Sequence, residues 1–159
     1  MIPLIQQISS NQQTLYATTK QPQQASTASF EQVLTTKIEQ AQFDETIYSE
    51  LANDYDIRNA TFDEVKEIAH KLYDAGAIKV KDLMTLTFDY GRATQDIKAA
   101  ANGLASPNFS MYETIADAAG KRDWLAEFEA RAAKDWQYGN LIGHANKTKI
   151  IQILQLIER

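Results

Sequence analysis

The feature that most constrains the fold is a pair of helix signals between Thr61 and Phe88. Thr61 and Glu64 have the spacing of a capping box, and the apolar residues that follow recur at helical intervals: Val65, Ile68, Ala69, Leu72 and Tyr73. Gly76 stands where a left-handed helix cap belongs, and a second apolar set runs from Ile78 to Phe88. The sequence therefore predicts a tight helical hairpin over residues 61–88.

Similar start and stop signals divide the rest of the chain into short helices. They are expected at 30–41, 43–53, 92–101, 110–119, 123–137 and 146–158, with Ser29, Asp44, Ser110 and Asp123 as candidate caps. No segment shows the sustained alternation of a half-buried strand, so we predict an all-α domain of seven to eight helices over residues 30–159. The Ile-rich run at 147–157 fits either a helix or a strand.

The sequence predicts apolar faces for two of these helices. The helix near 92–101 is expected to bury Ile97 and the following Leu104. The helix after Asp123 carries the heaviest aromatic face, from Trp124 to Trp136, and the stretch 138–143 is expected to break it. Ordinary core packing is the simplest interpretation of these aromatic residues.

The amino-terminal residues 1–29 differ in composition from the remainder. Lys20 is their one charged side chain, and Gln, Ser, Thr and Asn occupy 16 of the 29 positions. Such a stretch has little to bury, so it is predicted to be a flexible polar leader. It lacks the basic region of a secretory signal peptide and the arginines of a mitochondrial presequence.

Composition narrows the possible functions. The chain has no cysteine, which excludes thiol catalysis and Cys-containing zinc sites, and its net charge of −5 disfavours a nucleic-acid-binding protein. No apolar run reaches the length of a membrane-spanning helix. Catalytic fingerprints such as a nucleophile elbow or a phosphate-binding loop are missing, so the chain is expected to be no enzyme and to need no cofactor.

One set of residues suggests a metal site. Glu67 and His70 form an E-x-x-H pair, and Asp74 follows one turn later. Helical spacing places all three opposite the Val65 and Leu72 stripe, which is typical of a solvated face. A small metal-binding regulatory domain that uses these three residues is the alternative hypothesis.

Binding to a protein partner is the function class that the sequence favours. Ile151, Ile153 and Leu156 belong to a last helix whose apolar surface is wider than one stripe needs, which also suggests a homo-oligomer through that helix. In the leader, Ile2, Ile5 and Ile8 could form a short docking segment.

A polar leader running into Ser29-Phe30-Glu31-Gln32-Val33-Leu34 resembles the amino ends of bacterial flagellar rod and hook-basal-body proteins and of type III export substrates. The resemblance covers about the first 40 residues, and it implies a cytoplasmic protein that could leave the cell by a signal-peptide-independent route. The segment from Lys71 to Leu83 is similar to helical hairpins of bacterial oligomerisation modules. The expected function is that of a non-enzymatic export-associated substrate or accessory factor, and a phage or mobile-element helical protein is a further alternative.

Overall fold

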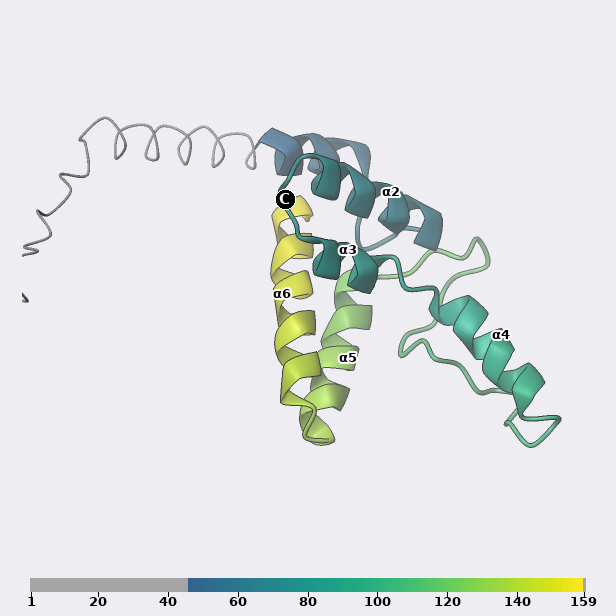
Figure 1. The fold of residues 1–159 in the computed structure, drawn as a ribbon. Coiled ribbons are helices and arrows are strands. Elements are labelled where there is room, and N and C mark those ends of the chain that lie inside the picture. The colour runs from purple at the N-terminus through teal and green to yellow at the C-terminus, as the bar shows by residue number, and fades with distance from the viewer. Residues whose placement is uncertain (1–45, 159) are drawn as a thin grey trace, which may run out of the picture. The chain divides into compact units, whose positions relative to one another are not determined.

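A computed structural model describes residues 46–158 (Figure 1), which belong to one compact unit of the chain. These residues form six helices, and the expected all-α fold is confirmed. The helices comprise residues 46–54, α2 (Phe62–Asp74), α3 (Val80–Leu86), α4 (Tyr90–Ala100), α5 (Trp124–Gln137) and α6 (Leu141–Ile157). The predicted leader, its boundary at residue 29 and the helix expected at 30–41 lie outside the described residues.

The predicted hairpin over residues 61–88 is present as α2 and α3. The Thr61 amide donates to Glu64 Oε2 (2.7 Å) and the Glu64 amide donates to Thr61 Oγ1 (3.2 Å), which confirms the capping box. Gly76 has a φ of 75°, so it supplies the left-handed residue that ends α2. Helix α3 is shorter than the expected 78–88 segment because Lys79 caps its start and Thr87 its end.

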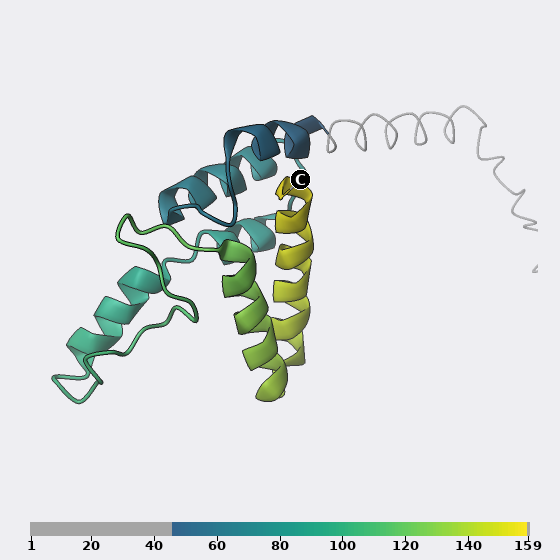
Figure 2. The ribbon, with the colours of Figure 1, turned by 180° about the vertical axis from the view of Figure 1, so that it is seen from behind.

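Helices α5 and α6 form a second hairpin, and the two views of the molecule show them side by side and antiparallel (Figures 1 and 2). Asp123 caps α5 as predicted, through a hydrogen bond from the Ala126 amide to Asp123 Oδ1 (2.9 Å). Helix α6 begins at Leu141, five residues earlier than expected, because Asn140 caps it. The open question at 147–157 is resolved in favour of a helix.

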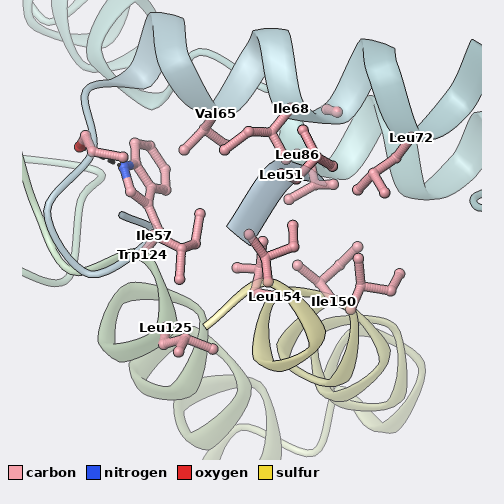
Figure 3. Close-up of a cluster of buried hydrophobic side chains, with 14 of the residues drawn as sticks. Leu51, Ile57, Val65, Ile68, Leu72, Leu86, Trp124, Leu125, Ile150 and Leu154 are labelled. Carbon is pink, nitrogen blue, oxygen red and sulfur yellow. Dashed lines mark hydrogen bonds between the residues drawn. The ribbon is translucent and has the colours of Figure 1, made fainter. Parts of the chain in front are cut away.

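The hydrophobic core lies where residues 46–54, α2, α3, the start of α5 and the second half of α6 meet (Figure 3). Trp124 is at its centre with 1% of its surface exposed, and its indole N–H donates to the Ala60 carbonyl (2.8 Å). A buried tryptophan needs such a partner, because an unpaired polar group away from water is costly. The other large apolar side chains with less than 2% exposure are Leu51, Ile57, Ile68, Leu72, Leu86, Leu125, Phe128, Ile150, Leu154 and Ile157.

The prediction of a helix at 110–119 is wrong. Residues 101–123 form an irregular connection between α4 and α5, here called the α4–α5 segment. Two amides within 110–119 bond to side chains that are distant in the sequence: the Met111 amide donates to Thr94 Oγ1 (2.9 Å), and the Thr114 amide donates to Glu127 Oε2 (2.8 Å). These tertiary hydrogen bonds replace the i to i−4 ladder of a helix.

The prediction that α4 buries Ile97 and the following Leu104 is also wrong. Ile97 is 43% exposed and Leu104 is 92% exposed, and Tyr90 is the one buried residue of α4. Among the named helices, the backbones of α5 and α6, of α2 and α3, and of α3 and α6 lie close together, whereas the α4 backbone lies close to none of them. It is held by the α4–α5 segment, for example through Lys98 Nζ, which donates to the Pro107 carbonyl (2.7 Å). None of the helices between residues 46 and 158 is long and apolar enough to cross a membrane.

Candidate interaction surface at the α5–α6 turn

A short turn with a defined geometry joins α5 to α6. Gly139 has a φ of 74°, and the Gly143 amide donates to Asn140 Oδ1 (3.0 Å) at the start of α6. The Asn140 side-chain amide donates in turn to Asp135 Oδ1 (3.1 Å) on α5. A Cβ at position 143 would come too close to the ends of the Asn140 and Asp135 side chains, so a larger residue there would displace these two groups. These hydrogen bonds therefore fix the backbone of the turn.

Four large apolar side chains surround this turn and lie in solvent. We call Trp136, Tyr138, Leu141 and Ile142 the hairpin tip; their exposed fractions are 63%, 73%, 59% and 75%. Single exposed apolar residues are common on protein surfaces, but such a concentration is typical of an interaction site. The Trp136 ring lies 5.2 Å from the His144 ring between centroids, which gives the indole a neighbour on α6.

The charged side chains beside the hairpin tip are balanced by ion pairs. Lys147 of α6 pairs with Asp135 of α5, and Lys134 Nζ lies 2.7 Å from Glu113 Oε1. Burial alone would raise the pKa of Asp135, but the hydrogen bond and the charge of Lys147 outweigh it and lower that pKa. The Asp135 carboxylate is thus ionised at neutral pH and ties the two helices together without leaving a net charge at the tip.

A buried carboxylate anchors the α4–α5 segment to α5. Glu127 has no exposed surface, yet it accepts hydrogen bonds from the Glu113 amide (3.1 Å), the Thr114 amide (2.8 Å) and Thr114 Oγ1 (2.6 Å). It also forms ion pairs with Arg131 (2.7 Å) and Arg122 (3.5 Å). Burial opposes ionisation, but these hydrogen bonds and the Arg131 charge prevail and lower the pKa of Glu127. We call Glu127, Arg122 and Arg131 the Glu127 cluster.

Two aromatic rings cover the guanidinium groups of this cluster. The Arg131 Cζ atom lies 3.3 Å from the centroid of the Tyr90 ring, and the Arg122 Cζ atom lies 3.5 Å from the centroid of the Tyr112 ring. Guanidinium groups stack favourably on aromatic faces, so these contacts hold α4 and the α4–α5 segment against α5. Burial raises the pKa of both tyrosines.

A cleft of about 350 Å³ opens between α4, the α4–α5 segment and the last turns of α5. Ile97, Phe109 and Met111 give it an apolar wall, while Arg131, Lys134 and Lys147 contribute cationic groups. This volume is within the range of about 300–1,000 Å³ that is usual for small-molecule sites.

The residues predicted as a metal site lie on the exposed face of α2. Glu67, His70 and Asp74 are all exposed, and Glu67 Oε1 is engaged by Lys71 Nζ at 3.2 Å. Hydrogen bonds from Tyr55 and Lys71 lower the pKa of Glu67. Across residues 46–158, no three His, Cys, Asp or Glu side chains are grouped in a way that could hold a metal ion.

The predicted partner-binding residues of the last helix have different environments. Ile153 lies in the core with 7% exposure, Ile151 is half-buried against the core, and Leu156 is 38% exposed. Ile2, Ile5 and Ile8 are outside the described residues. The more exposed apolar residues of α6 are Leu141 and Ile142 in its first turn.

Sequence reasoning missed both the hairpin tip and the Glu127 cluster. It assigned Trp136 to an apolar face and treated residues 138–143 as a simple break. The signal for the tip was a set of large apolar residues around the Gly139-Asn140 turn, and the signal for the cluster was an acid and an arginine four positions apart on an otherwise apolar face.

No protein-family model, curated protein or solved structure matches the chain, so its own geometry carries the functional interpretation.

Proposed function

We propose that this chain is a non-enzymatic interaction domain that binds a partner protein through the hairpin tip. The observation that carries the proposal is the exposure of Trp136, Tyr138, Leu141 and Ile142 on a turn with fixed geometry. Tryptophan and tyrosine are enriched among the residues that dominate binding energy at protein interfaces. Because the turn is already ordered by Asn140 and Asp135, binding would cost little backbone conformational entropy.

The shape and charge of the hairpin tip favour a concave, uncharged site on the partner. The tip is the convex end of two helices, and the cations beside it are neutralised by Asp135 and Glu113. Two aromatic and two aliphatic side chains offer roughly 500–600 Å² at most, less than the approximately 800 Å² per partner of a stable interface. Two copies meeting tip to tip would therefore associate weakly, whereas a groove can also cover the flanks of both helices.

The composition of the leader supports a role for this protein in export from the cytoplasm. Its composition and the Ser29-Phe30 motif resemble flagellar and type III export proteins, so we propose an export-associated substrate or accessory factor that starts in the cytoplasm. Deletion of residues 1–28 should leave the thermal transition of the helical domain nearly unchanged and abolish export or partner capture. An unfolded deletion variant would show that the leader is structural and would contradict this role.

Site-specific photo-crosslinking tests the binding proposal. A photoreactive amino acid at Ile142 should give one discrete adduct in cells that produce the protein naturally, and mass spectrometry should identify the same partner after isolation. The matched probe at Gln95, an exposed residue of α4, should give no such adduct. With the purified partner, Trp136→Ala should weaken the Kd by about 30-fold, which is the effect of losing a binding hot spot. Equal adducts at both positions, or an unchanged Kd, would contradict the proposal.

A further inference from the structure

The cleft beside Arg131 is a second surface, separate from the hairpin tip, and it combines one fixed cation with an apolar wall. We infer that this cleft binds an apolar carboxylate, meaning a ligand with one carboxylate group attached to an aliphatic or aromatic body. The inference goes beyond the proposed function, since it concerns a ligand site that the hairpin tip does not use.

Arg131 is already oriented for such a ligand. Its Nε donates to Glu127 Oε1 (2.7 Å), its Nη2 donates to the Met111 carbonyl, and its plane is stacked on Tyr90. Within residues 46–158, Nη1 has no hydrogen-bond partner, and no fully buried side-chain nitrogen or oxygen lacks one. Nη1 is therefore reached by solvent on a side chain that lines the cleft. A guanidinium held in this way can donate to a carboxylate without first losing rotamer freedom.

The charge of the Glu127 cluster also favours an anion. The Arg131 and Arg122 side chains are each 8% exposed, and both pair with the single carboxylate of Glu127. The Glu127 cluster therefore has one more positive than negative charge in a place with little access to water, and Arg131 is its member that lines the cleft. A desolvated charge is costly unless it is paired, so an added carboxylate would be stabilised there.

The remaining lining limits which anion fits. Glu113 and Asp135 neutralise Lys134 and Lys147 at the same cleft, so a polyanion would meet two carboxylates. Ile97, Phe109 and Met111 offer an apolar surface to the body of the ligand. One negative charge and an apolar group therefore match the cleft better than phosphate or sulfate. Such a group can come from a free organic acid or from the carboxyl end of a peptide.

Titration of the ¹⁵N-labelled full chain, followed by NMR, distinguishes these sources. 4-Phenylbutyrate should shift the amide signals of Met111 and Arg131 in a saturable way, whereas 4-phenylbutan-1-ol and sodium sulfate should not. An acetylated tetrapeptide ending in Phe identifies a peptide source if it binds more tightly than 4-phenylbutyrate and loses binding when its carboxyl end is amidated. Equal binding of the acid and the alcohol, or no saturable shift with any of these carboxylates, would overturn the inference.

Two variants of the cleft lining avoid the risk of unfolding the Glu127 cluster. Phe109→Ala removes part of the apolar wall and should weaken 4-phenylbutyrate binding about fivefold or more. Lys134→Gln removes a rim cation and should weaken it about two- to fivefold, the range for an exposed ion pair. Lys66→Gln, a change on α2 at a lysine paired with Asp63, is the matched control and should leave the Kd unchanged. Wild-type affinity in both cleft variants would place the ligand elsewhere and overturn the inference.

Discussion

The α5–α6 hairpin has two ends that carry similar apolar residues in opposite environments. At one end Trp124 is 1% exposed and belongs to the hydrophobic core (Figure 3). At the other end Trp136 is 63% exposed, with His144 as its ring neighbour. The chain contains two tryptophans, so each end is marked by one of them.

The difference shows that order and burial are separate properties in this hairpin. The Trp124 end is ordered because α2, α3 and residues 46–54 cover it. The tip is ordered by polar contacts, chiefly the Asn140 cap and the ion pair between Asp135 and Lys147, and no other described residue covers its apolar side chains enough to bury them. A turn that is rigid without being buried is suited to binding.

Replacing the buried tryptophan should have the largest effect on stability. Trp124→Ala removes the centre of the core and the hydrogen bond to Ala60, and it should lower the free energy of unfolding by about 4 kcal/mol. Denaturant unfolding monitored by circular dichroism measures this loss. A loss below about 1 kcal/mol would mean that the two ends of the hairpin do not differ as described.

Replacing the buried carboxylate of Glu127 should have the second-largest effect. Glu127→Gln leaves Arg122 and Arg131 without their counter-ion, so the free energy of unfolding at neutral pH should fall by about 3 kcal/mol. Glu129→Gln, on the exposed side of the same helix, is the matched control and should change it by less than about 0.5 kcal/mol. Similar effects of the two substitutions would show that the Glu127 cluster does not anchor the α4–α5 segment.

Acid should weaken the same anchor. The pKa of Glu127 is lower in the folded chain than its usual value near 4.5, so its contribution to stability is fully present above that value and is lost as the pH falls through the folded pKa. The Tm should therefore be nearly constant from about pH 7 to pH 5 and should fall below about pH 4.5. In Glu127→Gln the Tm should be lower at neutral pH and less dependent on acid. An equally steep fall in that variant would assign the pH dependence to other carboxyl groups.

The exposed tryptophan should matter least for folding. Trp136→Ala removes a side chain that is mostly in solvent, so the free energy of unfolding should change by less than about 0.5 kcal/mol. Denaturant unfolding, followed by the fluorescence of the remaining Trp124, gives this value. A loss comparable to that of Trp124→Ala would mean that the tip belongs to the core.

Local signals predicted much of the fold. The capping box at Thr61 and Glu64, the left-handed Gly76 and the Asp123 cap all lie where the sequence placed them, because these depend on neighbours within one helical turn. The expected helix at 110–119 failed for the opposite reason. The Thr114 amide in this stretch donates to Glu127, which lies 13 residues further along the chain, and no local sequence pattern predicts such a partner.

The hairpin tip could not be predicted for a related reason. Helical periodicity shows that Trp124, Phe128 and Trp136 fall on apolar positions, but it does not show how far neighbouring elements extend along the helix. Neighbouring elements cover α5 as far as Ala132, which is 5% exposed, but they leave Trp136 mostly in solvent. The position at which the apolar face of α5 becomes exposed depends on the tertiary structure.

Cysteine accessibility in cells shows whether a partner covers the hairpin tip. The chain has no cysteine, so Ile142→Cys and Gln95→Cys each introduce a single thiol at an exposed position. In the purified protein both thiols should react with a maleimide at similar rates. In the cells that produce the protein, the thiol at position 142 should be protected and the one at position 95 should react as before. Equal reactivity at both positions in cells would contradict the account, because the hairpin tip would then have no partner.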